Sequence, residues 1–228
     1  MYRRLDEAHI VDTLRRLELR IGERFPGSGL GKVSAELLAA ATESVERIRG
    51  LRRPNLPLRI GAWTLIAVIV FIVFEALLHL GLAPRWVDFA AFLGSSQAIQ
   101  NVVFLGLAVL FLANVETRIR RHRALAAIHE LRSIAHIVDM HQLTKDPDQL
   151  LQDAAVTASS PHRSMPRFEL SRYLDYCSEL LSLTSKVAAL YVQDSQDPVV
   201  LDAVNDVETL TTGLSGKIWQ KIMILDRA

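Results

Sequence analysis

The stretch Ile60–Leu82, IGAWTLIAVIVFIVFEALLHLGL, decides the fold, because its 23 residues include one formally charged side chain, that of Glu75. An α-helix needs about 20 consecutive, mostly apolar residues to cross the hydrocarbon core of a bilayer. Helices of soluble proteins are shorter on average, about 10 to 14 residues. The stretch therefore predicts a membrane-spanning helix.

A second apolar stretch, AIQNVVFLGLAVLFLANV, runs from Ala98 to Val115, and no residue between Asp88 and Glu116 carries a formal charge. We expect it to be a second span, so that residues 56–116 form a transmembrane hairpin with spans at about 60–82 and 98–115. The whole chain is 50% hydrophobic with a mean hydropathy of +0.21, which is high for a soluble protein. The composition therefore agrees with a chain that lies partly in lipid.

Arginines predict the orientation of the two spans. Those that flank the spans are Arg47, Arg49, Arg52, Arg53 and Arg59 before the first, and Arg118, Arg120, Arg121 and Arg123 after the second. The connecting loop contains only Arg85. Because Lys and Arg are enriched in cytoplasmic loops, we expect both termini in the cytoplasm. The Ala-, Leu- and Arg-rich composition suits a multi-pass protein of a bacterial inner membrane.

The remaining sequence predicts helices separated by prolines. We expect an N-terminal cytoplasmic helical hairpin at 1–55, a juxtamembrane stalk helix and short helix at 117–154, a linker at 155–166 and a C-terminal helical hairpin at 167–228. No stretch outside the spans has the pattern of a strand. The predicted fold class is all-α, an integral membrane protein with a central two-helix transmembrane hairpin and cytoplasmic helical segments.

Apolar residues at helical spacing predict which faces are buried. The N-terminal segment has Ile10, Leu14, Leu17, Ile21 and Phe25 on one face, and Val33, Leu37, Ala41, Val45 and Ile48 on the next. The final segment has a coiled-coil-like seam of Val200, Val204, Val207, Thr211, Leu214, Ile218, Ile222 and Leu225, facing Leu170, Leu174, Cys177, Leu181, Ala188 and Tyr191. Such seams need partners in the same chain or in another.

Several function classes are excluded. A formal charge of +1 gives no net basic field for nucleic acid, and the single cysteine, Cys177, excludes a Cys-based zinc site. The segment PGSGLGK at 26–32 lacks the first glycine and the final Ser or Thr of a phosphate-binding loop. Because no catalytic constellation appears, we expect no enzyme, metal or cofactor.

Four polar residues near the outer ends of the two spans form a candidate intramembrane cluster: Glu75, His79, Gln100 and Asn101. An ionisable residue at membrane depth is costly and is a functional hypothesis by default. The simpler interpretation is that these side chains only hold helices together through hydrogen bonds. The alternative is an ion or proton path.

A candidate histidine stripe follows the stalk, with His122, His129 and His136 at intervals of seven residues, extended by Arg132 and Asp139. Successive histidines are about 10.5 Å apart along a helix, so one chain alone cannot bind a metal with two of them. The stripe is either a solvated polar face or, where stalks bundle, a switch near pH 6.5.

Four arginines, Arg118, Arg120, Arg121 and Arg123, form a membrane-surface basic cluster. They serve as the orientation signal, and they would also hold anionic headgroups.

The arrangement of cytoplasmic helix, two spans with a short outer loop and cytoplasmic helix resembles that of mitochondrial calcium uniporter pores and of two-span effectors of bacterial defence systems. The uniporter motif W-D-x-x-E-P is not present, since Trp86, Val87, Asp88 and Phe89 lack the adjacent Asp, the Glu and the Pro. The resemblance is therefore one of architecture and implies no site residue.

We expect a two-span membrane protein that offers a non-enzymatic cytoplasmic platform for self-association or for a helical protein partner, with the lipid bilayer as its other partner. The alternative is an oligomeric two-span ion channel or transporter-like pore that uses Glu75, such as a defence-type membrane effector.

Overall fold

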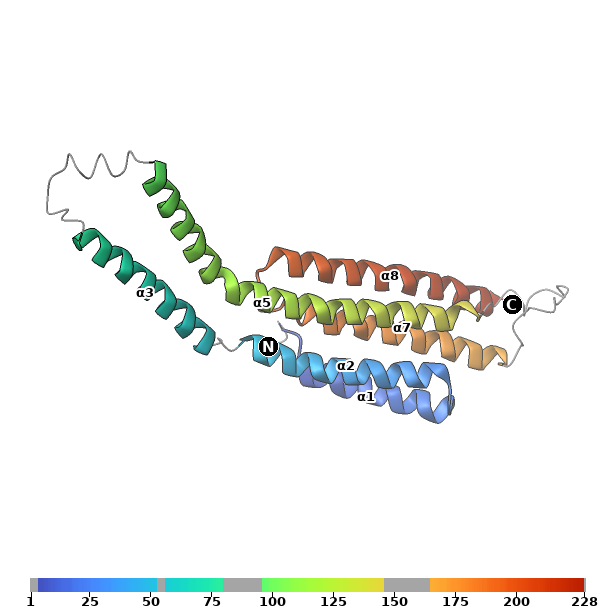
Figure 1. Ribbon diagram of the computed structural model, residues 1–228. Coiled ribbons are helices and arrows are strands. Elements are labelled where there is room, and N and C mark those ends of the chain that lie inside the picture. The colour runs from blue at the N-terminus through green and yellow to red at the C-terminus, as the bar shows by residue number, and fades with distance from the viewer. Residues whose placement is uncertain (1–3, 53–55, 80–95, 146–164, 228) are drawn as a thin grey trace. The chain divides into compact units, whose positions relative to one another are not determined.

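The computed structural model describes residues 4–52, 56–79, 96–145 and 165–227 (Figure 1). It contains six helices in these residues: α1 (Glu7–Arg24), α2 (Gly29–Arg52), α3 (Leu56–His79), α5 (Ser96–Leu143), α7 (Arg167–Ala189) and α8 (Pro198–Arg227). No strand occurs in the described ranges, and the predicted all-α class is confirmed. None of the helices, over the residues described, has the length and apolarity of a membrane span.

The chain divides into two compact units. We call Met1–Arg52 with Arg123–Ala228 the bundle unit, and Arg53–His122 the apolar unit. Helix α5 is continuous over 48 residues and contributes to both. The bundle unit contains residues of the predicted N-terminal hairpin, stalk and C-terminal hairpin.

Local signals start and end the helices of the bundle unit. Asp6 begins α1, because its Oδ1 accepts hydrogen bonds from the backbone N–H groups of Ala8 (2.9 Å) and His9 (3.2 Å). The chain then turns at Gly27, whose φ of 71° favours glycine. The Oγ of Ser28 accepts from the backbone N–H of Gly31 at 3.1 Å in the first turn of α2.

A capping aspartate also begins α8, after the connection from α7. Asp197 accepts hydrogen bonds from the backbone N–H groups of Val199 (3.0 Å) and Val200 (3.4 Å) and so caps α8, whose first residue is Pro198. Helix α7 ends at Ala189. The reason is that the N–H groups of residues 190–192 bond to carbonyls three residues back, which tightens the last turn.

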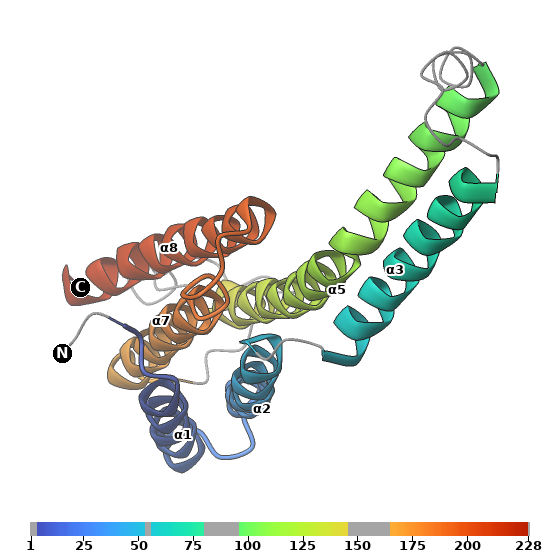
Figure 2. The ribbon, with the colours of Figure 1, turned by 90° about the vertical axis from the view of Figure 1, so that its left-hand side faces the viewer.

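Helix α7 lies at the centre of the bundle unit, in contact with α1, α2 and α8 (Figures 1 and 2). Large, fully buried side chains come from all five helices of this unit: Leu14, Leu17, Ile21, Leu30, Leu37, Ile128, Leu131, Leu174, Leu180, Leu181 and Ile218. Each such side chain contributes on the order of 1.5–3 kcal/mol through burial. All residues of the predicted N-terminal faces and C-terminal seams are buried.

Candidate functional site

The four residues of the candidate intramembrane cluster belong to two helices. Glu75 and His79 belong to α3, and Gln100 and Asn101 belong to α5. The side chains of all four lie outside the described residues.

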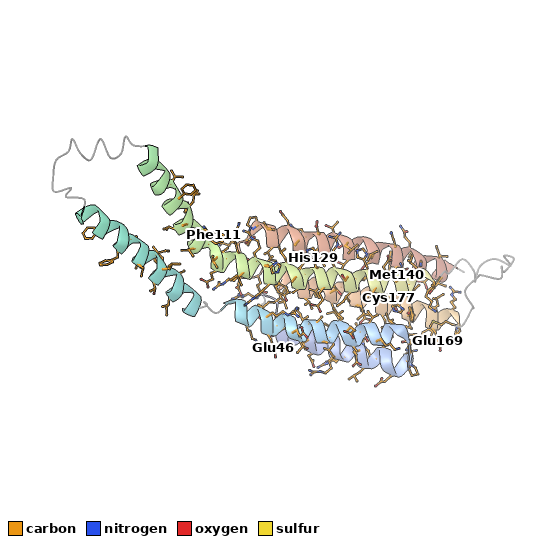
Figure 3. All side chains as sticks on the ribbon, viewed as in Figure 1. Glu46, Phe111, His129, Met140, Glu169 and Cys177 are labelled. Carbon is orange, nitrogen blue, oxygen red and sulfur yellow. The ribbon has the colours of Figure 1, made fainter. Side chains whose placement is uncertain are left out.

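The histidine stripe follows the outer face of α5. His122, His129, Arg132 and His136 are exposed, and the Oδ1 of half-buried Asp139 accepts a hydrogen bond from the Nε2 of Gln142 at 2.6 Å. Figure 3 shows His129 and Met140 on this helix, and Met140 is 66% exposed. No group of three His, Cys, Asp or Glu side chains in the described part of the chain is placed to hold a metal ion.

The opposite face of the same helix is buried. Ala127, Ile128, Leu131, Ala135 and Val138 are all at most 2% exposed. The residues expected to form a stalk are therefore part of the core of the bundle unit from Ala124 onward.

The basic cluster does not act as a set of four equivalent cations. Arg118 is exposed and its guanidinium lies 5.5 Å from the centroid of the Phe111 ring, two turns earlier on α5. Arg120 pairs with Glu116 and is half-buried, as is Arg121. Arg123 is exposed and belongs to the bundle unit. The contact between Arg118 and Phe111 is a cation–π interaction, which the other three arginines of the cluster do not share with Phe111.

An ion pair that the sequence did not reveal joins α2 to α5. The Nη1 of Arg47 donates to Oε2 of Glu130 at 3.0 Å, and Arg47 also pairs with Glu43 on its own helix. The hydrogen bond with Glu130 raises the pKa of Arg47 against the opposing effect of burial. Burial raises the pKa of the nearby Tyr191, so its phenol stays protonated.

The buried titratable groups of the core are kept neutral. Cys177 is 0% exposed, lies inside the bundle on α7 (Figure 3), and has its pKa raised to about 12 by burial. Burial also raises the pKa of Tyr173. A thiol with this pKa is protonated at neutral pH and is a poor nucleophile. Cys177 therefore acts as a small core residue.

A groove on the surface of the bundle unit was also not predicted. It encloses about 500 Å³ and its lining includes Thr13 of α1, Ser178 and Ser182 of α7, and Trp219 and Ile222 of α8. Trp219 is 61% exposed although it borders the groove. Trp219 lies between the seam residues Ile218 and Ile222 but off their stripe. A single aromatic residue outside an apolar stripe has no periodic pattern, so the sequence did not indicate a role for Trp219.

Comparisons of the chain with known protein families, with curated proteins and with solved structures find no match.

Proposed function

We propose that the chain is a two-span inner-membrane protein, with both termini in the cytoplasm, whose bundle unit is a non-enzymatic platform for self-association. One observation carries the proposal: residues before 52 and after 123 fold into the same compact unit. A chain that leaves a folded unit at one point and rejoins it later must cross any intervening membrane an even number of times. Two spans meet this condition.

The apolar unit supplies the second line of support. Its helix α3 contains only Arg59 and Glu75 as formally charged residues among 24. Large apolar side chains are exposed along both of its helices: Ile60, Trp63, Leu65, Val68, Val70, Phe71 and Phe74 on α3, and Val103, Phe104, Leu107, Leu110 and Phe111 on α5. Soluble proteins rarely expose so many large apolar side chains to water. A helix that is apolar on all sides is favourable in lipid.

The interaction role is proposed for the bundle unit because large apolar side chains remain exposed on its surface, outside its buried core. Phe168, Trp219 and Met140 are 65%, 61% and 66% exposed. Single exposed apolar residues are common in soluble domains, so only those that border a hollow suggest docking. The channel alternative depends on Glu75, whose side chain lies outside the described residues, and the proposal is limited to the platform.

Membrane insertion and topology are tested together in cells that express the full chain. We expect the protein to stay in the membrane fraction after an alkaline carbonate wash. A Ser96→Cys variant, at the first residue of α5 and on the side expected outside, should react with a membrane-impermeant maleimide in intact cells. An Ala35→Cys variant, at an exposed position of α2, should react only after permeabilisation. Release by carbonate, or labelling of Ala35→Cys in intact cells, would contradict the proposal.

A further inference from the structure

One exposed face of α5 changes from apolar to basic within the apolar unit. Phe104, Leu107 and Phe111 lie on this face at helical spacing, and all three are exposed; we call them the apolar stripe. Arg118 comes two turns after Phe111, His122 comes one turn after Arg118, and both are exposed. At 1.5 Å per residue the apolar stripe is about 10 Å long. A single helix face therefore carries an apolar stripe that is followed by two basic side chains.

The charge of Arg118 lies close to the end of the apolar stripe. Its guanidinium is 5.5 Å from the centroid of the Phe111 ring, and Figure 3 shows Phe111 on α5. The two residues are seven positions apart, so the Arg118 side chain extends back along the helix toward its N-terminus, as long helical side chains do. Because Arg118 is exposed, its N–H groups remain accessible to an acceptor from outside the chain.

Arg118 also differs from its neighbour Arg120 in its partners. Within the described ranges the Arg118 side chain contacts the Phe111 ring and forms no ion pair. Arg120 pairs with Glu116, which is the only acidic residue between positions 104 and 122. Two positions along a helix correspond to a rotation of about 200°, so Glu116 and Arg120 both lie on the side of α5 opposite to Arg118. The face of the apolar stripe therefore carries basic side chains and no acidic one.

We propose that this face binds an anionic phospholipid, with an acyl chain along the apolar stripe and the phosphate at Arg118 and His122. A phospholipid has the same order of chemistry, because its apolar chains are joined to a phosphate group. Guanidinium and imidazole N–H groups donate to phosphate oxygens, and a planar guanidinium can form two parallel bonds with one phosphate. A zwitterionic headgroup would add an ammonium group, for which this face has no carboxylate. A headgroup with a net negative charge is therefore the better fit.

The inference rests on the proposed membrane location of the chain, and it adds the class of lipid and the residues that select it. Arginines near a membrane attract anionic lipids without any bound site, so a control for this general attraction is needed. Arg123 provides it, because it is exposed and lies five positions beyond Arg118, at a rotation of about 140°. General attraction depends on both arginines, whereas the proposed site depends on Arg118 alone.

The test uses the full chain in detergent with equal amounts of phosphatidylglycerol and phosphatidylcholine that have the same acyl chains. Native mass spectrometry gives the ratio of chains that carry one phosphatidylglycerol to chains that carry one phosphatidylcholine. We expect a ratio above one for the wild type. Arg118→Gln should lower it about fivefold, as expected for the loss of one cation beside an anionic headgroup. Arg123→Gln should leave it unchanged.

Two further variants separate charge from geometry. Arg118→Lys keeps the charge but not the planar guanidinium, and it should retain more of the preference than Arg118→Gln. It also keeps the inference testable if Arg118→Gln does not fold. Phe111→Leu keeps the apolar stripe but removes the ring that contacts the guanidinium, and it should lower the ratio less than Arg118→Gln does.

A free anion is distinguished from a lipid by adding inorganic phosphate or chloride at equal ionic strength. Both salts should lower the ratio equally, through screening alone. A larger effect of phosphate would identify a site for the free anion and overturn the lipid as occupant. Equal ratios for the wild type and Arg118→Gln would also overturn the inference, as would an equal loss in Arg123→Gln.

Failure of this inference is distinguishable from failure of the proposed function. A chain that carbonate releases from the membrane contradicts the membrane assignment itself. A chain that resists carbonate but shows no preference for phosphatidylglycerol contradicts only the proposed lipid site.

Discussion

Arg47 of α2 and Glu130 of α5 form a hydrogen-bonded ion pair at 3.0 Å across 83 residues of sequence. Both predicted spans lie between the two residues. The pair therefore joins the segment that precedes the apolar unit to the segment that follows it, within the bundle unit.

We expect this pair to stabilise the bundle only modestly. The side chains of Arg47 and Glu130 are 39% and 47% exposed, and exposed ion pairs contribute about 0.2–1 kcal/mol. A double-mutant cycle of Arg47→Met and Glu130→Gln, followed by urea unfolding of the full chain in detergent, should give a coupling energy in that range. The coupling should shrink at 1 M salt. A coupling above about 2 kcal/mol that salt does not change would contradict this expectation for a partly solvated pair.

Two leucines of α8 provide a matched test of the seam. Leu214 is 5% exposed and Leu201 is 46% exposed. Leu214→Ala should lower the free energy of unfolding by about 2–5 kcal/mol, because it removes a buried side chain and leaves a cavity. Leu201→Ala should change it by at most about 0.5 kcal/mol. Equal effects of the two substitutions would show that the seam is not the buried face.

The seam was predictable from sequence for a physical reason. Helix periodicity places residues such as Val207 and Leu214 on one stripe whatever their partner is, and burial of the stripe follows from its apolarity. The start of α8 at Asp197-Pro198 also depends only on neighbouring residues. The Asp197 carboxylate caps the helix by accepting from a backbone N–H group within three residues.

Features that depend on which helices become neighbours were not predictable. Ile128, Leu131, Ala135 and Val138 lie at helical spacing and indicate an apolar face on α5, but they do not indicate which helices cover it. The Arg47–Glu130 pair and the Trp219 groove likewise arise from tertiary packing between segments far apart in the sequence. The heptad of His122, His129 and His136 was visible, but its exposed position follows only from the packing of the opposite face of α5.

The pKa of Cys177 predicts a loss of stability at high pH. In the unfolded chain this thiol ionises near the ordinary pKa of 9.0, whereas in the folded chain burial raises the pKa to about 12. Between these values the folded chain binds more protons than the unfolded chain, so stability falls as pH rises above about 9. Burial raises the pKa of Tyr173 as well, with the same sign.

The measurement is the unfolding midpoint at pH 8 and at pH 10.5 for the wild type and for Cys177→Ala. We expect the midpoint of the wild type to fall more between the two pH values than that of the variant. In the wild type a thiol reagent should react only after denaturant is added, because Cys177 is 0% exposed. Rapid labelling of the native protein at pH 8 would be inconsistent with the buried thiol.

Glycines within helices supply a last prediction, on stability. Gly213 and Gly216 lie inside α8, both are exposed, and a Cβ added at either would meet no atom within 4 Å. Glycine in a helix interior is less favourable than alanine by about 0.5–1 kcal/mol. Gly213→Ala and Gly216→Ala should each therefore raise the unfolding midpoint of the chain, by about 1–4 °C for a protein of this size.

Gly29→Ala should behave differently, although Gly29 is also helical. A Cβ at Gly29, in the first turn of α2, would fall on the imidazole ring of His141 of α5, which would have to turn away. We expect this substitution to give no gain in the midpoint or a loss. In a His141→Ala background the obstacle is removed, and Gly29→Ala should then raise the midpoint as the α8 substitutions do. If Gly29→Ala is equally favourable in both backgrounds, the two helices do not approach each other at this position as the structure shows.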